Sequence, residues 1–272
     1  MDGVLRKKAA ALRGAMRDRE RLLVAYSGGV DSGLVCKLAV DALGSRALAV
    51  TALAESLPDR EFRAARRFAA EMGIRHRVVR YSELANEAYV GNPTNRCYFC
   101  RQDLGRALRP IAEEEGIDAI ADGVLVSDLG PERPGIRAMD EAGFWHPLVE
   151  QEIDKTQVRT LAVELDLSFH DKPSMACLSS RIPHGQVVTL EKLRRIEQAE
   201  DVLYAMGFRQ VRVRHHGDVA WVEVAQEEVG RLREGALRSR VARELRSLGY
   251  AHVEVDPRGY RTGGLNEPIP GS

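Results

Sequence analysis

The chain has 272 residues, enough for one large domain and one smaller one, and apolar residues make up 44% of it, which suffices for a buried core. Its 40 basic and 40 acidic residues give a formal net charge of zero, which argues weakly against binding long stretches of nucleic acid, because proteins that do so carry a basic surplus. No apolar run approaches the roughly 20 residues that cross a bilayer. The charged segment 1–21 is typical of a helix rather than of a signal peptide. We therefore expect a cytoplasmic protein.

Strands and helices alternate through most of the chain. Four short apolar runs are typical of buried strands, at 21–26, 47–53, 76–80 and 119–126. Four segments with apolar residues at helical spacing predict helices, at 30–43, 59–72, 102–115 and 155–165. This alternation predicts an α/β fold in which helices cover both faces of a parallel sheet.

Two irregular segments interrupt the pattern before it changes. Gly, Pro and Asp are frequent in 127–143, which predicts a mobile loop, and 171–185 has no regular period, which we interpret as a functional loop. Smaller elements follow, with Thr189 as a helix N-cap: a helix at 189–206, strands at 210–214 and 220–224, a helix at 236–248 and a strand at 252–256. We expect a larger α/β domain at 1–186 and a smaller α+β domain at 187–272.

A glycine-containing turn, Ser27–Ser32 (SGGVDS), lies between the first predicted strand and the first predicted helix. This arrangement points backbone N–H groups and the positive end of a helix at one spot, which suits an anion. The two glycines let the backbone approach a ligand closely, and the two serines add hydroxyl donors. The carboxylate of Asp31 would repel phosphate unless it caps the helix or shares a magnesium ion with the phosphates.

This turn resembles the SGGxDS loop of the ATP-pyrophosphatase superfamily, whose members cleave ATP between its α and β phosphates; an ordinary strand-to-helix turn is the alternative. It is not a Walker-type loop, because it lacks G-x-x-x-x-G-K-[ST]. The resemblance implies that ATP and Mg²⁺ are bound, with ATP contacts from Ser27, Gly28, Gly29, Asp31 and Ser32. Ser56, just after the second predicted strand, lies where such folds hold the adenosine.

The four cysteines divide into a pair and two single residues. Cys97 and Cys100 form a C-x-x-C, which suits a redox pair, half of a zinc site or part of an iron–sulfur site. Cys36 lies within the helix after the phosphate loop, and we interpret it as a buried thiol. Cys177 lies in an irregular loop near an arginine and two serines, surroundings that can make a thiol nucleophilic. Three cysteines fit a [4Fe–4S] cluster with one open iron; the alternatives are a zinc ion completed by His184, or cysteines that only pack.

Four segments together resemble the ATP-dependent sulfur transferases that build the nickel-pincer nucleotide of lactate racemase. They are SGGVDS at Ser27–Ser32, KPSMACLSSRIPHG at Lys172–Gly185, VRVRHHGDVAWVEV at Val211–Val224 and GYRTGGLNE at Gly259–Glu267. The resemblance implies that ATP adenylates a carboxylate of pyridinium-3,5-biscarboxylic acid mononucleotide, and that sulfur then replaces the adenylyl group to give a thiocarboxylate. In one branch of this family a cysteine matching Cys177 gives up its sulfur and becomes dehydroalanine. Cys97 and Cys100 make the chain similar to the other branch, in which three cysteines bind [4Fe–4S].

The same resemblance implies a substrate site. Arg212 and Arg214 alternate along a predicted strand and so share one face, where two guanidinium groups suit a phosphate; a solvated basic face is the alternative. The resemblance adds Ser180 and Arg181 to this phosphate site. The residues that it implies at the catalytic centre are Cys177, Glu200 and Glu223, and those that it implies as metal ligands are Cys97, Cys100 and Cys177.

Three other functions stay open from the sequence. A tRNA-thiolating enzyme of the same superfamily is disfavoured by the balanced charge and the lack of a recognisable RNA-binding appendage. An ammonia-using amide ligase would not need the C-x-x-C, and a non-catalytic nucleotide-binding module would not need Cys177. We expect a small-molecule nucleotide as the substrate and sulfide or a desulfurase as the sulfur donor, with neither nucleic acid nor a membrane as partner. Members of the resembled family form closed assemblies, so a homo-oligomer, by analogy a hexamer, is expected.

Overall fold

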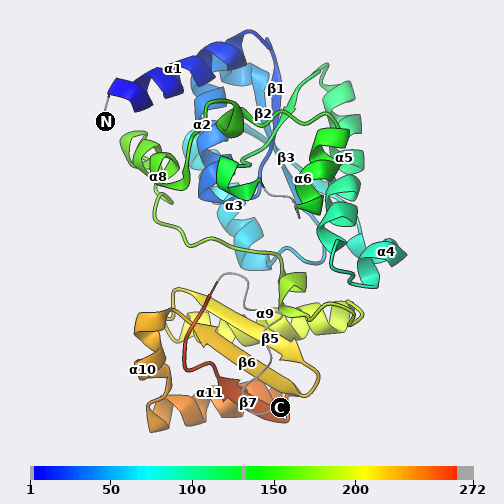
Figure 1. The fold of residues 1–272 in the computed structure, drawn as a ribbon, viewed down its shortest axis with the longest axis vertical. Helices are drawn as coiled ribbons and strands as arrows, with labels where there is room; N and C mark the ends of the chain where they lie inside the picture. Colours follow the sequence, from blue (N-terminus) through cyan, green and yellow to red (C-terminus); the bar gives the residue numbers. More distant parts are fainter. Residues whose placement is uncertain (1–2, 130–132, 262–272) are drawn as a thin grey trace. The chain divides into compact units, whose positions relative to one another are not determined.

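A computed structural model describes residues 3–129 and 133–261. By its contacts the chain divides into two compact units, one formed by 1–83 with 95–175 and the other by 84–94 with 176–272 (Figure 1). This division falls after Met175, whereas the boundary expected from the sequence falls after residue 186. The assignment of 1–186 and 187–272 to two domains therefore stays a prediction.

The first unit contains the predicted parallel sheet. In the described residues its strands are β1 (Leu22–Ala25), β2 (Ala47–Leu53), β3 (Arg75–Arg80) and β4 (Ile120–Ala121), in the order β3-β2-β1-β4. Every neighbouring pair is parallel. The prediction of a strand over 119–126 was too long, because the backbone N–H of Val124 bonds to the side chain of Asp122 at 3.0 Å and turns the chain out of the sheet.

Helices cover both faces of this sheet, as the alternation predicts. The helices of this unit are α1 (Gly3–Arg17), α2 (Val30–Leu43), α3 (Asp59–Met72), α5 (Arg96–Glu114), α6 (Pro134–Glu141), α7 (Pro147–Glu150) and α8 (Lys155–Glu164), with short 3-10 turns η1 (Gly44–Arg46) and η3 (Val126–Asp128). Leu22 and Val24 of β1 face a core shared with α1, α2 and α8, whereas Leu23 faces a core shared with α5 and α6. Successive residues of a strand point to opposite faces, so the unit has three layers.

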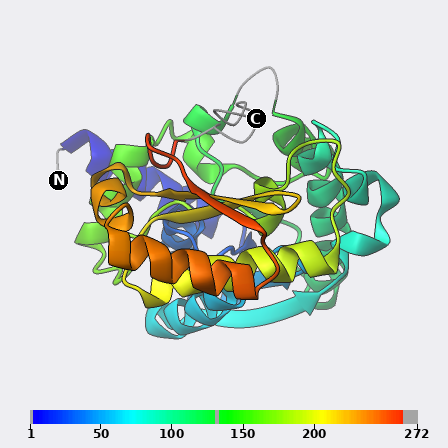
Figure 2. The ribbon, with the colours of Figure 1, turned by 90° about the horizontal axis from the view of Figure 1, so that it is seen from below.

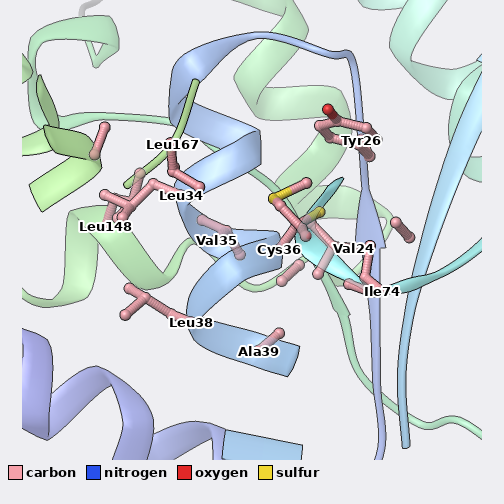
Figure 3. Packing of buried hydrophobic residues seen from close by; sticks show 14 of the residues in the cluster. Val24, Tyr26, Leu34, Val35, Cys36, Leu38, Ala39, Ile74, Leu148 and Leu167 are labelled. Carbon is pink, nitrogen blue, oxygen red and sulfur yellow. The ribbon is translucent and has the colours of Figure 1, made fainter. Parts of the chain in front are cut away.

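The core around α2 includes one of the cysteines. Figure 3 shows Cys36 on α2 among Val24, Tyr26 and Ile74. The Cys36 side chain is completely buried, and this burial raises the pKa of its thiol. The interpretation of Cys36 as a buried thiol is confirmed.

Two local predictions for this unit were wrong. The helix expected from residue 102 begins at Arg96, so the C-x-x-C lies on the first turns of α5 instead of preceding it. The segment 127–143, expected to be a mobile loop, contains the helix α6, which begins at a proline and buries Ala138 and Met139. A proline suits the first turn of a helix, where its missing N–H costs nothing.

The second unit is a smaller α+β arrangement. Among the described residues β5 (Val211–His216) pairs antiparallel with β6 (Val219–Val224), which pairs parallel with β7 (His252–Val255). Figure 2 shows α9 (Leu190–Ala205) and α11 (Gly235–Ser247) along one face of this sheet, where they share an apolar core with it. The shorter helices are α4 (Glu87–Val90), α10 (Val229–Leu232) and the 3-10 turns η2 (Glu83–Ala85, which begins in the first unit), η4 (Leu178–Arg181) and η5 (Gln226–Glu228). In neither unit is any described helix both long enough and apolar enough to cross a bilayer.

Candidate active site

The phosphate loop, Ser27–Ser32, connects the carboxyl end of β1 to α2. Gly28 has a φ of +77°, and a Cβ added there would lie 2.8 Å from the Cβ of Ala65 on α3, so this position requires glycine. The hydroxyl oxygens of Ser27 and Ser32 lie 3.0 Å apart across the turn. The N-cap of α2 is Gly29, which has no side chain to bond the first-turn N–H groups. These backbone donors suit an anion.

The end of β4 lies directly against this loop. A Cβ added to Gly123 would lie only 2.5 Å from the backbone nitrogen of Ser32. The neighbouring Asp122 is buried, and one of its oxygens lies 2.8 Å from Nδ1 of His146, whose Nε2 lies 3.0 Å from a carboxylate oxygen of Asp140. Burial alone would lower the pKa of His146, but its bonds to the two carboxylates raise that pKa. The carboxyl ends of β1 and β4 are therefore an ordered, polar edge, at the kind of position where open α/β sheets bind ligands.

Two lysines bind the phosphate loop. The ammonium of Lys155 lies 2.6 and 2.7 Å from the carboxylate oxygens of Asp31. The ammonium of Lys172 donates to the carbonyl oxygen of Gly28 at 2.8 Å and pairs with Glu61 at 2.7 Å. Sequence reasoning missed both lysines. Lys172 begins one of the family-like segments and was open to detection, whereas nothing local marks Lys155.

The first unit fits a bound nucleotide in three respects. A Cβ would fill the space at Gly28, the N-terminus of α2 has no side-chain cap, and the ammonium group of Lys155 pairs with Asp31 of the loop. Ser56 follows the carboxyl end of β2, the neighbour of β1, and is buried. The contacts of these residues with ATP stay predictions.

The cysteine pair lies at the start of α5. Cys97 is exposed and Cys100 is half-buried, and the two are one helical turn apart. The thiol of Cys100 donates to a carboxylate oxygen of Glu83 at 3.0 Å. Two thiols at this spacing can bind one metal centre from a single helix.

Cys177 directly precedes η4, which contains two of the predicted phosphate ligands, Ser180 and Arg181. It is the N-cap of η4, and its carbonyl oxygen accepts hydrogen bonds from the Ser180 hydroxyl at 2.8 Å and from the Arg181 guanidinium at 2.9 Å. A second segment holds this loop: the side-chain amide of Asn92 donates to the carbonyl oxygens of Ile182, Pro183 and Gln186 at 2.8 to 3.2 Å. The loop of Cys177 is therefore fixed by residues that lie far away in the sequence.

The predicted phosphate ligands lie in a buried cluster of charges. Arg181 and Glu200 are both fully buried and pair at 2.8 Å, and Arg214 pairs with Glu223 at 2.9 Å. The guanidinium of Arg214 also donates to the carbonyl oxygen of Ser180 at 3.2 Å. The alternative of a solvated basic face is therefore wrong. Burying charged groups is costly unless they are paired. This buried, paired cluster is therefore a candidate ligand-binding site.

Arg212 adds a third guanidinium group to this cluster. Its guanidinium is buried, stacks over the ring of Tyr260 at 4.9 Å and donates to the carbonyl oxygen of Val211 at 2.7 Å. Burial, together with the nearby charge of Arg181, lowers the pKa of Arg212. The guanidinium groups of Arg181, Arg212 and Arg214 suit an anionic ligand. Sequence reasoning missed Tyr260, although it lies in the last family-like segment, of which 262–267 fall outside the described residues.

Comparison with known proteins now decides the family. Residues 5–90 match the family model described as asparagine synthase. A pyridinium-3,5-bisthiocarboxylic acid mononucleotide synthase from Lactiplantibacillus plantarum is 36% identical over 266 residues, which cover 97% of this chain and 96% of that protein. The chain belongs to this synthase family. It is thereby an enzyme of the PP-loop superfamily, an ATP-dependent sulfurtransferase.

Two further relatives match the chain over different shares of its length. An uncharacterized protein from Synechocystis is 41% identical over 266 residues, 98% of this chain and 99% of that protein. A tRNA-specific 2-thiouridylase from Caulobacter sp. is 27% identical over 208 residues, which cover 62% of this chain and 51% of that enzyme. The likeness to the synthase extends over nearly the whole chain, whereas the likeness to the thiouridylase is partial.

The three cysteines expected to bind an iron–sulfur cluster are divided between the two units. Cys97 and Cys100 belong to the first unit and Cys177 to the second. Within 3–129 and 133–261, no three His, Cys, Asp or Glu side chains are grouped as a metal site would need. The thiol pair fits a cluster in chemistry and spacing, and binding of [4Fe–4S] by all three cysteines stays a proposal.

Proposed function

We propose that this chain adenylates a carboxylate of pyridinium-3,5-biscarboxylic acid mononucleotide and replaces the adenylyl group by sulfur. A carboxylate is a poor electrophile until one of its oxygens is part of a good leaving group. The carboxylate oxygen attacks the α phosphorus of ATP, and pyrophosphate leaves. A sulfur nucleophile then attacks the acyl carbon, AMP leaves, and a thiocarboxylate results.

The observation that carries this proposal is the position of Cys177 beside the buried arginine cluster. Its backbone carbonyl accepts a hydrogen bond from the guanidinium of Arg181, which pairs with Glu200 in the buried cluster. Arg181, Arg212 and Arg214, with Ser180, would bind the phosphate of the mononucleotide. Glu200 and Glu223 would hold these arginines in place and keep the local charge low until the phosphate arrives.

In the first unit the phosphate loop would hold ATP. The N–H groups at the start of α2 would bind the leaving pyrophosphate, with Ser27 and Ser32 as hydroxyl donors. Asp31, which pairs with Lys155, would bind a Mg²⁺ ion on the phosphates. Ser56 would contact the adenosine.

The three cysteines Cys97, Cys100 and Cys177 would hold a [4Fe–4S] cluster. Such a cluster, when bound, supplies an open iron at which hydrosulfide can bind. Sulfide or a desulfurase would be the sulfur donor. A homo-oligomer, by analogy a hexamer, and a cytoplasmic location complete the proposal.

The direct test is a reaction with ATP, Mg²⁺, sulfide and the mononucleotide, monitored by pyrophosphate release and by the mass of the product. We expect pyrophosphate release that requires the mononucleotide, and a product in which sulfur replaces oxygen. Asp31→Asn should lower pyrophosphate release by about 10²-fold, the size expected when one electrostatic contact to the transition state is lost. Asp41→Asn, on the same helix but paired with Lys37 away from the loop, should leave the rate unchanged. Release that responds to unmodified tRNA and not to the mononucleotide would favour tRNA thiolation instead.

The cluster has a separate test, which does not depend on activity. After anaerobic reconstitution we expect about four irons and matching acid-labile sulfide per chain. Cys97→Ala, Cys100→Ala and Cys177→Ala should each reduce this content, whereas Cys36→Ala should retain it. A chain that binds no iron, and in which Cys177 loses the mass of its sulfur after one turnover, would instead support sacrificial sulfur transfer.

A further inference from the structure

A short segment, 169–172, packs against the phosphate loop and the start of α2, although it lies far from them in the sequence. At one end, a Cβ added to Gly33 would lie 2.4 Å from the ring of Phe169. At the other end, the Lys172 ammonium donates to the Gly28 carbonyl oxygen at 2.8 Å. One segment therefore contacts the loop at Gly28 and the helix α2 at Gly33, directly after the loop.

The contact of Lys172 is built into the first unit and is not a surface encounter. Its side chain is 15% exposed, its ammonium lies 2.7 Å from Glu61 on α3, and it lies 5.4 Å from the ring centroid of Phe68. Gly28 in turn packs on Ala65 of the same helix. The Gly28 peptide thus lies between α3 and the lysine.

The backbone beyond Phe169 is also fixed, and it leads to Cys177. Arg159 on α8 donates to the carbonyl oxygens of His170 at 3.0 Å and of Lys172 at 3.2 Å. The second unit resumes at Ala176, four residues after Lys172. Lys172 thus connects the Gly28 carbonyl oxygen, through one hydrogen bond, to the backbone that continues through 173–176 to Cys177.

We propose that Lys172 is a positioning residue that couples nucleotide occupancy of the phosphate loop to the linker 173–176 and so to Cys177. The inference rests on the proposed function, because it takes the loop to be the ATP site. Gly28 has a left-handed backbone that turns without side-chain hindrance. When phosphate binds the loop N–H groups, the Gly28 carbonyl reorients and Lys172 follows it. Adenylation and the exposure of the sulfur-site cysteine are thereby linked.

The test measures the alkylation rate of Cys177 in the full chain by peptide mass spectrometry, with and without α,β-methylene-ATP and Mg²⁺. This analogue cannot be cleaved between its α and β phosphates. Lys172→Met keeps the aliphatic stem over Phe68 and removes the ammonium. Lys8→Met is the matched control, because the Lys8 ammonium also donates to a backbone carbonyl, that of Glu152 at 2.6 Å, elsewhere in the same unit. Calorimetric binding of the analogue and the thermal midpoint are recorded for each variant.

We expect the analogue to change the Cys177 rate several-fold in the parent chain and in Lys8→Met, and not in Lys172→Met, although this variant still binds the analogue. A response that persists in Lys172→Met overturns the coupling. Loss of binding in a folded Lys172→Met also overturns it, because the lysine would then be a direct phosphate ligand. If Lys172→Met does not fold, Lys172→Arg, which retains a cation at a different reach, must change the size of the response, and an unchanged response overturns the proposal. Absence of analogue binding in the parent chain would refute the ATP site itself, whereas binding without any Cys177 response would refute only the coupling.

Discussion

At the scale of single residues, the second unit contains charged side chains that are buried and paired with one another. Arg181 and Glu200 are fully buried, and Glu200 also accepts the backbone N–H of Val213 at 3.2 Å. Removing a charge from water costs several kcal/mol, and a partner must offset that cost. The same residues that we assign to phosphate binding therefore also decide whether this unit folds.

The first prediction concerns the Arg181 guanidinium. Arg181→Met leaves the Glu200 carboxylate buried without its partner, so the free energy of unfolding should fall by about 3–5 kcal/mol. Urea titration followed by circular dichroism measures this loss. The control is Arg243→Met, whose pair with Glu244 has side chains that are 73% and 42% exposed, and it should cost less than about 1 kcal/mol. Equal small losses in both variants would contradict the role of the buried pair.

A second prediction at this scale follows from His215 on β5. Burial, with the positive charges of Lys192 and Arg195, lowers the pKa of His215 to about 4. The folded chain therefore holds it neutral, and its contribution is fully present above the unfolded pKa of about 6.5 and is lost as the pH falls toward 4. Over that window the free energy of unfolding should decrease by about 1.4 kcal/mol per pH unit on account of this residue.

Nuclear magnetic resonance gives the direct measurement for His215. Its ring C–H resonance should titrate near pH 4 in the native chain, and His215→Gln should reduce the slope of stability against pH between 6.5 and 4. The exposed His252 is the internal control, because it lies at the surface of β7. A titration midpoint of His215 near 6.5 would show that the ring is hydrated.

At the scale of elements, the local sequence determines where some helices begin and does not predict where others begin. Thr189, predicted as an N-cap, is the N-cap of α9, and its hydroxyl oxygen accepts the backbone N–H of Lys192 at 3.2 Å. The start of α5 shows the opposite case, because the chain becomes helical six residues before the apolar spacing predicts. That earlier start puts Cys97 and Cys100 on one turn of a rigid helix.

The prediction for this scale is the cost of the α9 cap. Thr189→Ala leaves a first-turn N–H without its acceptor, and the free energy of unfolding should fall by about 1 kcal/mol. Thr160→Ala is the matched control, because the Thr160 hydroxyl bonds back to the Thr156 carbonyl on the exposed surface of α8, and it should change stability by less than about 0.5 kcal/mol. Thr189→Ser, which keeps the hydroxyl, should recover most of the loss. Denaturant titration of all three variants decides the point.

At the scale of the whole molecule, the four thiols differ in burial, so their reactivities measure the opening of different parts of the chain. Cys97 is exposed, Cys100 and Cys177 are half-buried, and Cys36 lies in the core of the first unit. A buried group reacts only when the structure around it opens. The reactivities of the cysteines therefore distinguish local from global opening.

We expect Cys97 to be alkylated fastest in the native chain and Cys36 only on unfolding, because burial both excludes the reagent and raises the pKa of the Cys36 thiol. Mass spectrometry of the labelled peptides, at increasing urea, measures each site. The Cys36 rate should rise along the unfolding curve of the first unit, and Cys36→Ala should remove this slow phase without altering the others. Native-state labelling of Cys36 at the rate of Cys97 would contradict the packing around α2.

The sequence alone determined the elements whose signals are local. Alternating strand and helix periods predicted the parallel α/β sheet, and SGGVDS between a strand and a helix located the loop that family membership now supports. These signals depend on backbone sterics and on apolar residues repeated within one element, so a single stretch of chain carries them. The family-like segments also contain Arg181, Arg212 and Arg214.

Only the tertiary structure decided which distant residues meet. It paired each of Arg181 and Arg214 with a glutamate, placed Lys155 and Lys172 on the phosphate loop, and joined 84–94 to the unit that contains Cys177. No local period encodes such contacts, because a charged side chain looks the same in the sequence whether it is solvated or buried. Its burial and its partner follow from how the whole chain packs, and only a partner offsets the desolvation cost of a buried charge.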